Sequence, residues 1–186
     1  MAIRHPVDSM QAATSIKRIT AGDSALHCQL GSLLRDAVEG GASVGYVLPV
    51  PEVDIDQYWH GVFADVQQGT LILLVAEQAG QVIGSAQLSL CMKPNGKHRA
   101  EVQKVLVHRS ARRRGVGRDL LHAIEHQAAK FGRNLLVLDT ESGSGGQRLY
   151  AATGYQVAGS IPHFALATVP DKKISHVATT FMYKLL

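Results

Sequence analysis

Residues 109–118 combine arginines and glycines in a pattern suited to holding an anion. They follow the β-branched stretch 101–107 and precede residues with a helical period, so they form a turn between a strand and a helix. A helix N-terminus offers free N–H donors and a partial positive charge, and glycine lets the backbone approach a ligand closely. The turn therefore suits a phosphate group.

The basic charge of the chain is concentrated in this turn. Residues 109–118 hold five arginines and no acidic residue, whereas the rest of the chain has fourteen basic and fifteen acidic residues. Nucleic-acid binders usually spread Lys and Arg over a whole face. We therefore expect a local anion site and no nucleic-acid partner. An RNA-binding turn, whose affinity would fall steeply with salt, is the alternative.

The predicted helix after the turn is amphipathic. Val116, Leu120, Ile124 and Ala128 recur every four residues and give one apolar face. Before the turn, apolar runs and turn residues predict three successive antiparallel strands. These strands are expected at residues 70–77, 82–91 and 101–108.

The remaining elements lie at the two ends of the chain. Residues 1–14 show no period and are expected to form a loose, flexible arm, and no linker divides residues 15–186, which we treat as one domain. The other predicted strands are 15–20, 134–140, 155–160 and 177–184, with a loop at 161–175; the continuous apolar run in 134–140 suits a buried, parallel position. The other predicted helices start at Asp23, after Pro51 and shortly before Gly154.

Composition favours a soluble cytoplasmic protein. The N-terminus has no apolar signal segment, and the longest apolar run, residues 71–76, is too short to span a bilayer. Cys28 and Cys91 are expected to be buried thiols of a reducing compartment. No His/Cys cluster has ligand spacing, so we expect no metal and no membrane partner.

Two motifs together resemble the GCN5-related N-acetyltransferase (GNAT) family. Arg112-x-x-Gly115-x-Gly117 is similar to the family's acetyl-CoA signature at a helix start. Leu149-Tyr150, followed by Gly154-Tyr155, is similar to its second conserved element. The resemblance covers roughly residues 15–186. It implies an α/β (α+β) fold: a mixed, mostly antiparallel sheet of about six to seven strands, flanked by about four helices and splayed where acetyl-CoA binds.

Further segments are similar to a family member that inactivates an amino-acid-like toxin. The likeness fades at 142–148 and 156–176, regions that can shape the acceptor pocket. The similar segments are 40–45, 85–91, 93–96, 99–104 and 138–141.

The resemblance also assigns cofactor contacts. Backbone N–H groups and arginine side chains of the turn would receive the pyrophosphate of acetyl-CoA, and the preceding strand would pair with the pantetheine arm. Ser144 and Gln147 would line the sulfur. The turn and strand residues concerned are Val105, Leu106, Val107, Arg112, Arg113, Arg114, Gly115, Val116, Gly117 and Arg118.

Acetyl transfer to an amine needs a base and an acid. Glu101 is the first candidate for the base and Asp139 the second, directly or through water; a sheet-end ion pair is the alternative for each. Tyr150 is the candidate acid for the leaving thiolate, with a core tyrosine as the alternative. His98 and His108 are read as surface or strand-end residues.

The expected function is direct acetyl transfer from acetyl-CoA to a primary amine of a small molecule, such as an amino-acid-like toxin or antibiotic. A protein or peptide acceptor and a non-catalytic acyl-CoA sensor are the alternatives. Because relatives are often dimers, the resemblance also makes a homodimer an option.

Overall fold

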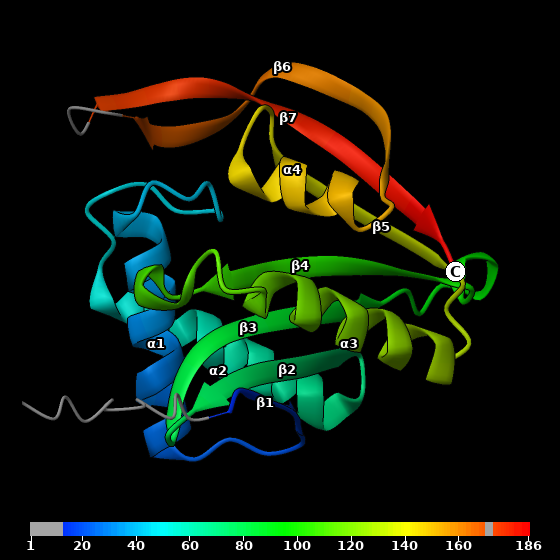
Figure 1. Ribbon diagram of the computed structural model, residues 1–186, viewed down its shortest axis with the longest axis horizontal. Helices are drawn as coiled ribbons and strands as arrows, with labels where there is room; N and C mark the ends of the chain where they lie inside the picture. Colours follow the sequence, from blue (N-terminus) through cyan, green and yellow to red (C-terminus); the bar gives the residue numbers. More distant parts are fainter. Residues whose placement is uncertain (1–12, 170–172) are drawn as a thin grey trace, which may run out of the picture.

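The computed structural model describes residues 13–169 and 173–186, so most of the predicted N-terminal arm lies outside the described residues. Seven strands form one sheet in the order β1-β2-β3-β4-β5-β7-β6, with helices on both of its faces (Figure 1). The strands are β1 (Ser15–Ile19), β2 (Leu71–Gln78), β3 (Gln81–Leu90), β4 (Arg99–Val107), β5 (Leu135–Glu141), β6 (Gln156–Val169) and β7 (Lys173–Leu185). The helices are α1 (Ser24–Glu39), α2 (Glu52–Gln68), α3 (Val116–Lys130) and α4 (Gly145–Ala152).

The pairing of the strands confirms the predicted mixed, mostly antiparallel sheet. β1 to β4 pair antiparallel in sequence order, and β5 and β6 each pair antiparallel with β7. β4 and β5 pair in parallel, as the continuous apolar run of β5 suggested. The connection between them is α3, the crossover that a parallel pair requires.

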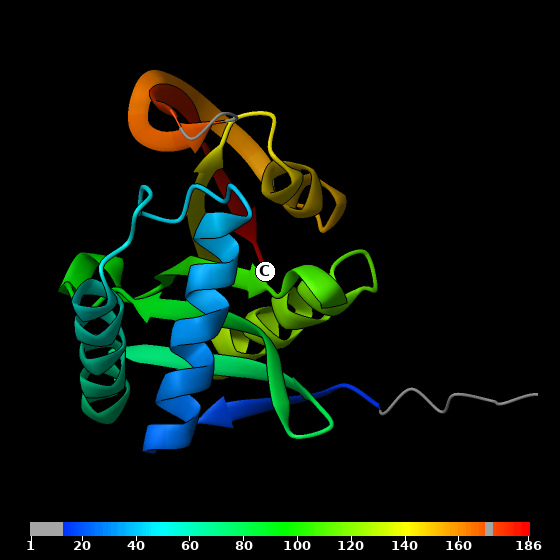
Figure 2. The same cartoon turned by 90° about the vertical axis from the view of Figure 1, so that its left-hand side faces the viewer.

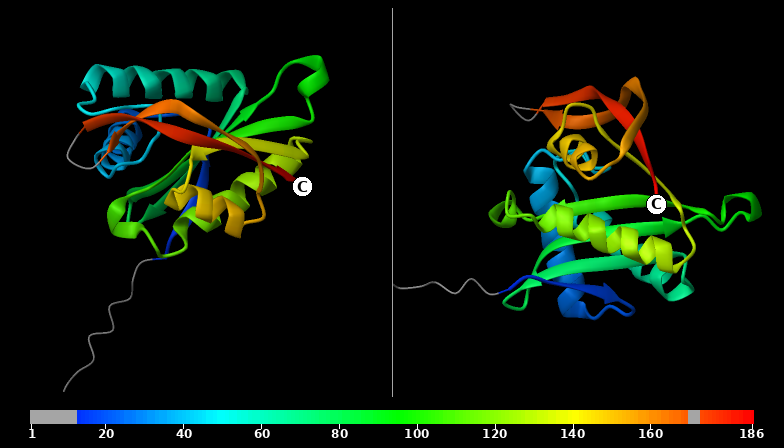
Figure 3. Two further views of the ribbon diagram at one scale, coloured as in Figure 1. Left: turned by 90° about the horizontal axis from the view of Figure 1, so that it is seen from above. Right: turned by 45° about the vertical axis from the view of Figure 1, so that its right-hand side comes forward.

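Two apolar layers hold the helices against the sheet. α3 covers one face, where Val116, Leu120, Ile124 and Ala128 are all buried, as their spacing predicted. α1 and α2 cover the opposite face (Figures 2 and 3). Trp59 of α2 is completely buried in this second layer. Among the described helices, none is long and apolar enough to cross a membrane.

The predicted loop at 161–175 is wrong, because β6 and β7 continue as a long hairpin through most of it. Ala165 pairs with Val177, and the ladder runs on to Val169 and Lys173. β6 is the edge strand, where proline is tolerated, and Pro162 lies inside a register shift between Ile161 and Ala165. An edge bulge therefore absorbs the residue that made the sequence read as a loop.

The expectation of two buried thiols is also wrong. Cys28 is exposed on α1, and Cys91 is half-buried. The core side of α1 is made by Leu30, Leu33 and Leu34, which leaves Cys28 on the side away from the sheet.

Leu120 on α3 provides a test of this packing. We expect Leu120→Ala to lower the free energy of unfolding by about 2–5 kcal/mol, because the side chain is fully buried and its removal leaves a cavity. Val53→Ala is the control, since Val53 is 55% exposed. Urea denaturation measures both, and equal effects of the two substitutions would contradict the assigned core.

Candidate functional site

The parallel strands β4 and β5 pair over a short length and then diverge, which makes a fork in the sheet (Figure 1). Pairing covers only Arg99–Glu101 with Leu135–Val137, although β4 runs on to Val107 and β5 to Glu141. In the described part of the chain, no strand pairs with β4 along its β5 side beyond Glu101. The predicted splay is therefore present, with residues 105–107 along its open edge.

The arginine turn lies at the end of β4 and leads into α3. Gly115 is the N-cap residue of α3, with φ 88°, and no side chain caps the helix. The first N–H groups of α3 are therefore available to an anion, as the glycine spacing indicated. Gly117 lies against α4, because a Cβ built on it would come within 3.0 Å of Leu149 Cδ2.

The arginines of this turn divide into two groups. Arg112 is engaged internally, since its Nε donates to the carbonyl of Val107 at 3.0 Å. Arg113, Arg114 and Arg118 are exposed; Arg114 contacts Gln78 at 3.4 Å and Arg118 contacts Asp119 at 3.4 Å. Arg112 is exposed as well, but its guanidinium is bonded to the Val107 carbonyl, so Arg113, Arg114 and Arg118 are the more available to an anion.

Asp36 on α1 anchors the start of the turn, a role that sequence reasoning missed. Its carboxylate accepts from the backbone N–H of Arg109 at 2.9 Å and from the Arg109 guanidinium. His108 Nε2 lies 3.4 Å away and an Arg112 nitrogen 3.8 Å away. The only sequence signal was a carboxylate set among apolar residues of a predicted helix.

The environment of Asp36 favours its charged form. Burial acts to raise the pKa of Asp36, but the hydrogen bonds from Arg109 and the nearby positive charges outweigh it, so the pKa lies below its ordinary value. The paired arginine responds in the opposite sense, because Asp36 raises the pKa of Arg109. The contact therefore fixes the turn onto α1 as an ion pair.

The candidate bases lie on the two arms of the fork. Glu101 pairs in register with Val137, and Asp139 lies two residues farther along β5, so both carboxylates project from the same face. Glu101 is half-buried and Asp139 exposed. Within the described chain neither side chain makes a hydrogen bond or an ion pair within 4.0 Å, so the alternative of sheet-end ion pairs finds no support.

Tyr150 enters the same region from α4. Its side chain is 8% exposed and packs edge-on against Tyr155, with ring centroids 5.8 Å apart. Burial, and then the charge of Asp139, raise the pKa of Tyr150 well above its ordinary value. The hydroxyl makes no hydrogen bond to any described residue, which differs from the satisfied hydroxyl of the core-tyrosine alternative.

Ser144 and Gln147 cap α4. Ser144 Oγ accepts from the Gln147 N–H at 3.1 Å, and Gln147 Oε1 accepts from the Gly143 N–H at 2.5 Å. Both side chains thus fix the start of the helix that carries Tyr150. Their contact with the sulfur of the cofactor stays a prediction.

Lys104 is a second residue that sequence reasoning missed. It has a φ of +46° at an irregularity in the β3–β4 ladder, and its ammonium lies 5.2 Å from the centre of the Tyr58 ring. Burial lowers the pKa of Lys104, and the charges of Asp139 and Glu101 act against that shift. Both candidate bases therefore lie within electrostatic reach of one ammonium group.

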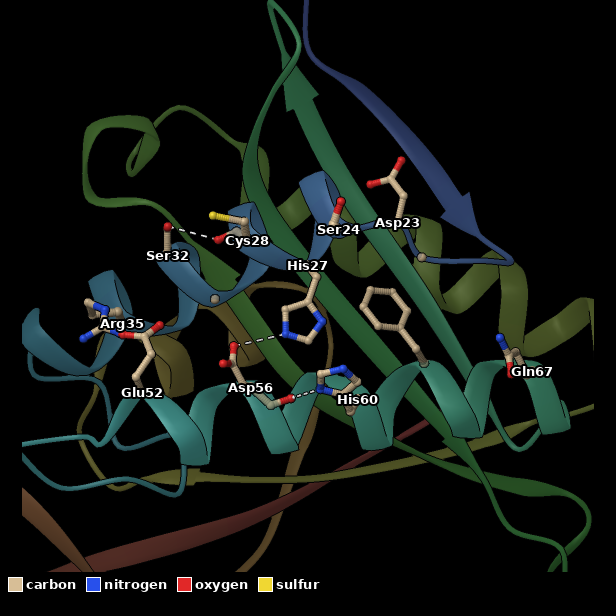
Figure 4. A pocket seen from close by; sticks show the side chains of 13 residues that line it. Asp23, Ser24, His27, Cys28, Ser32, Arg35, Glu52, Asp56, His60 and Gln67 are labelled. Atoms are coloured by element: carbon tan, nitrogen blue, oxygen red, sulfur yellow. Dashed lines mark hydrogen bonds and ion pairs between the residues drawn. The ribbon is translucent and has the colours of Figure 1, made fainter.

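A separate groove of about 670 Å³ lies between α1 and α2 (Figure 4). His27 and Asp56 meet across it at 3.2 Å, and His60 stacks near His27 with ring centroids 4.5 Å apart. None of the predicted site residues lines this groove. Among the described residues, no group of three or more His, Cys, Asp or Glu side chains has an arrangement that would hold a metal ion.

The chain is similar to known proteins in sequence and in fold. The profile of the Acetyltransferase (GNAT) family matches residues 29–155. An uncharacterized N-acetyltransferase of Azospirillum brasilense, from the hisH-hisA intergenic region, is 33% identical over 109 residues, which cover 56% of this chain and 61% of the relative. The match thus spans less than two thirds of that relative.

Two solved structures share the fold. Ribosomal-protein-alanine N-acetyltransferase from Brucella melitensis aligns with a TM-score of 0.73 and 24% identity, over 92% of this chain and 99% of the other. YncA from Salmonella typhimurium, solved with its cofactor acetyl-CoA, aligns with a TM-score of 0.72 and 22% identity, over 94% of this chain and 95% of the other. At these identities the likeness concerns the fold alone.

Asp36→Asn tests the anchor of the arginine turn. We expect the substitution to lower the free energy of unfolding by about 1–3 kcal/mol at pH 7, because it removes the charge from a hydrogen-bonded pair. The folded pKa lies below the ordinary value of 3.8, so this contribution is complete well above pH 3.8 and is lost as the pH falls through and below it. The difference between wild type and variant should therefore shrink below pH 3.8.

Thermal unfolding over a pH series measures this difference. Asp65→Asn is the matched control, since Asp65 is exposed on α2 and should change stability by less than about 0.5 kcal/mol. A difference for Asp36→Asn that grew on acidification would contradict the assignment.

Proposed function

This chain belongs to the Acetyltransferase (GNAT) family, and we propose that it is an N-acetyltransferase that moves the acetyl group of acetyl-CoA directly to a primary amine of a small molecule. The observation that carries the proposal is the fork between β4 and β5. It brings an open strand edge, an uncapped helix N-terminus, two carboxylates and a buried tyrosine to one region of the sheet.

The residues around the fork fit acetyl-CoA as co-substrate. Residues 105–107 offer a free strand edge to the amide groups of the pantetheine arm. The first turn of α3 offers N–H donors to the pyrophosphate, and the exposed Arg113, Arg114 and Arg118 offer charge to phosphate oxygens. A backbone N–H of β4 can also donate to the thioester oxygen as that oxygen gains charge.

In this proposal Glu101 removes the proton from the acceptor ammonium, directly or through a water. An alkylammonium is mostly protonated at neutral pH and has no lone pair for attack, so a base must act first. Glu101 is half-buried on β4 next to the point where the strands part. Asp139 is the second candidate, and its exposure favours a part in drawing the ammonium in from solvent.

In this proposal Tyr150 gives a proton to the thiolate that leaves the thioester. Acetyl-CoA bound in the fork supplies a thioester, whose acyl carbon accepts the amine and whose sulfur leaves as a thiolate. A tyrosine with a raised pKa is fully protonated at neutral pH, so its hydroxyl can donate to that sulfur. The lack of another hydrogen-bond partner among the described residues leaves the hydroxyl free to do so.

The acceptor side of the site supports a small molecule. The backbone N–H of Leu48 donates to Thr168 Oγ1 at 2.9 Å, so the loop before α2 is tied to the β6–β7 hairpin. The expected likeness of residues 99–104 and 138–141, which contain both candidate bases, to a family member that inactivates an amino-acid-like toxin leads us to propose such a compound as acceptor.

A protein or peptide amine is the second candidate acceptor. The name of the Brucella melitensis protein, a ribosomal-protein-alanine N-acetyltransferase, favours it. Turnover confined to peptides in an amine panel would select this alternative.

Tyr150→Phe tests whether the chain is an enzyme. We expect the substitution to lower kcat for thiol release by about 10²- to 10⁴-fold, because it removes only the general acid. Acetyl-CoA affinity, measured by calorimetry, should stay within about threefold, since the ring and its packing remain. Tyr183→Phe is the control, because the Tyr183 hydroxyl binds Gln156 outside the fork. An acyl-CoA sensor would bind acetyl-CoA but show no turnover in the wild type.

Glu101→Gln and Asp139→Asn separate the two candidate bases. We expect Glu101→Gln to lower kcat/KM by about 10²-fold or more, and Asp139→Asn to have the smaller effect. Glu141→Gln, at the end of β5, serves as the matched control. If Asp139→Asn caused the larger loss of kcat/KM, Asp139 would be the base and Glu101 the second carboxylate. Full activity in both variants would mean that neither carboxylate takes part in the reaction.

A further inference from the structure

We propose that Lys104 binds an anionic group of the acceptor, so that the acceptor carries a carboxylate close to its reacting amine. The inference rests on the proposed function and narrows its substrate class to compounds that resemble amino acids. It is carried by the Lys104 ammonium, which lies over the Tyr58 ring and beside Gly45 of the loop before α2, within electrostatic reach of the two candidate bases.

The backbone of β4 is irregular at Lys104. Its φ of +46° lies in the left-handed region, which is uncommon for a residue other than glycine. The β3–β4 register shifts between Ser85 and Gln87, and Ser85 Oγ bonds the Lys104 carbonyl at 3.4 Å. A bulge redirects side chains, and a strained residue of this kind costs on the order of 1–3 kcal/mol and is found most often at functional sites.

Among the described residues, no group near the end of the Lys104 side chain accepts a hydrogen bond from its ammonium. The ammonium lies over the face of the Tyr58 ring, and a Cβ built on Gly45 would lie 3.7 Å from it. Lys104 is half-buried. Within the described residues it makes no hydrogen bond and no ion pair within 4.0 Å. A half-buried ammonium with three free donors is therefore available to an anion that enters the site.

Tyr58 is a fixed support for this ammonium. Its hydroxyl donates to Gln87 Oε1 at 2.8 Å, and Tyr46 packs edge-on against its ring with centroids 6.2 Å apart. Gln87 is 1% exposed, and its Nε2 has no partner among the described residues. The support thus comes from α2, β3 and the loop before α2, on the side opposite to α3.

The charges around the fork are complementary to those of a zwitterion, a molecule that carries both an ammonium and a carboxylate. Glu101 and Asp139 attract the ammonium of the acceptor, and Lys104 attracts a negative group bonded near it. Asp139 and Glu101 both act electrostatically on the Lys104 ammonium, so charges of both signs are available to a small molecule at the fork. If Lys104 served only to hold the charges of the two carboxylates, its loss would affect all amines alike.

The test compares matched acceptors. The first set contains L-α-amino acids and the second contains the corresponding α-amides, which keep the amine and lose the carboxylate. Thiol release from acetyl-CoA gives kcat/KM for wild type, Lys104→Met, Lys104→Arg and the exposed control Lys130→Met. Met keeps an unbranched apolar chain that can pack over Tyr58 and ends one atom short of the lost ammonium.

We expect wild type to prefer the carboxylates by about 10- to 100-fold, the range of a charge-assisted hydrogen bond. Lys104→Met should lose this preference, because kcat/KM should fall about 10- to 100-fold more on the carboxylates than on the amides. Lys104→Arg should retain most of it, and Lys130→Met all of it.

Three outcomes would overturn the inference. Equal rates on both sets in wild type, or a Lys104→Met loss that is the same on both, would remove Lys104 from acceptor binding while leaving acetyl transfer intact. Turnover confined to longer peptides, whose carboxylate is remote from the amine, would do the same. Absence of thiol release with any amine would contradict the proposed function itself.

Discussion

The parting of β4 from β5 is the constraint on which the site depends. Three residue pairs join the strands, and beyond them the backbone of β4 has no described strand partner on that side. Unpaired strand edges are costly when buried and invite pairing when open. The sheet thus leaves one edge of β4 open beyond Glu101, while β5 pairs with β7 on its other side and α3 packs against the shared core.

Apolar packing positions β4 and β5, whereas an ion pair anchors the arginine turn that follows β4. Asp36 on α1 binds Arg109 through backbone and side chain, so the helix on one face of the sheet fixes the start of a turn that leads to the helix on the other face. This contact uses Arg109, and Arg112 bonds the Val107 carbonyl; the other three arginines of the turn are exposed and take no part in these contacts. The basic cluster is therefore partly structural and partly free for an anion.

Sequence periodicity and capping predicted the frame of this fold well. The four apolar positions of α3 are buried, and Asp23 caps α1 by accepting from Leu26 N–H at 2.7 Å. These features follow from local rules. The long β6–β7 hairpin could not be predicted in this way, because an edge strand tolerates a proline and a bulge that local sequence rules assign to a loop.

The site was only partly readable from the sequence. Tyr150 belongs to a recognisable motif, Glu101 and Asp139 lie in segments with an expected likeness to a relative, and all three lie near the fork. Asp36 and Lys104 belong to no recognisable motif, since their roles arise from contacts between residues far apart in the chain. Asp36 meets Arg109 across seventy-three positions, and Lys104 rests on Tyr58 from another element.

Amide hydrogen exchange tests the central claim, that the fork holds acetyl-CoA, most directly. Exchange rates of individual N–H groups, measured by NMR with and without acetyl-CoA, should slow along residues 105–107 and in the first turn of α3. Unchanged rates in both places, with protection instead along the groove between α1 and α2, would contradict the account.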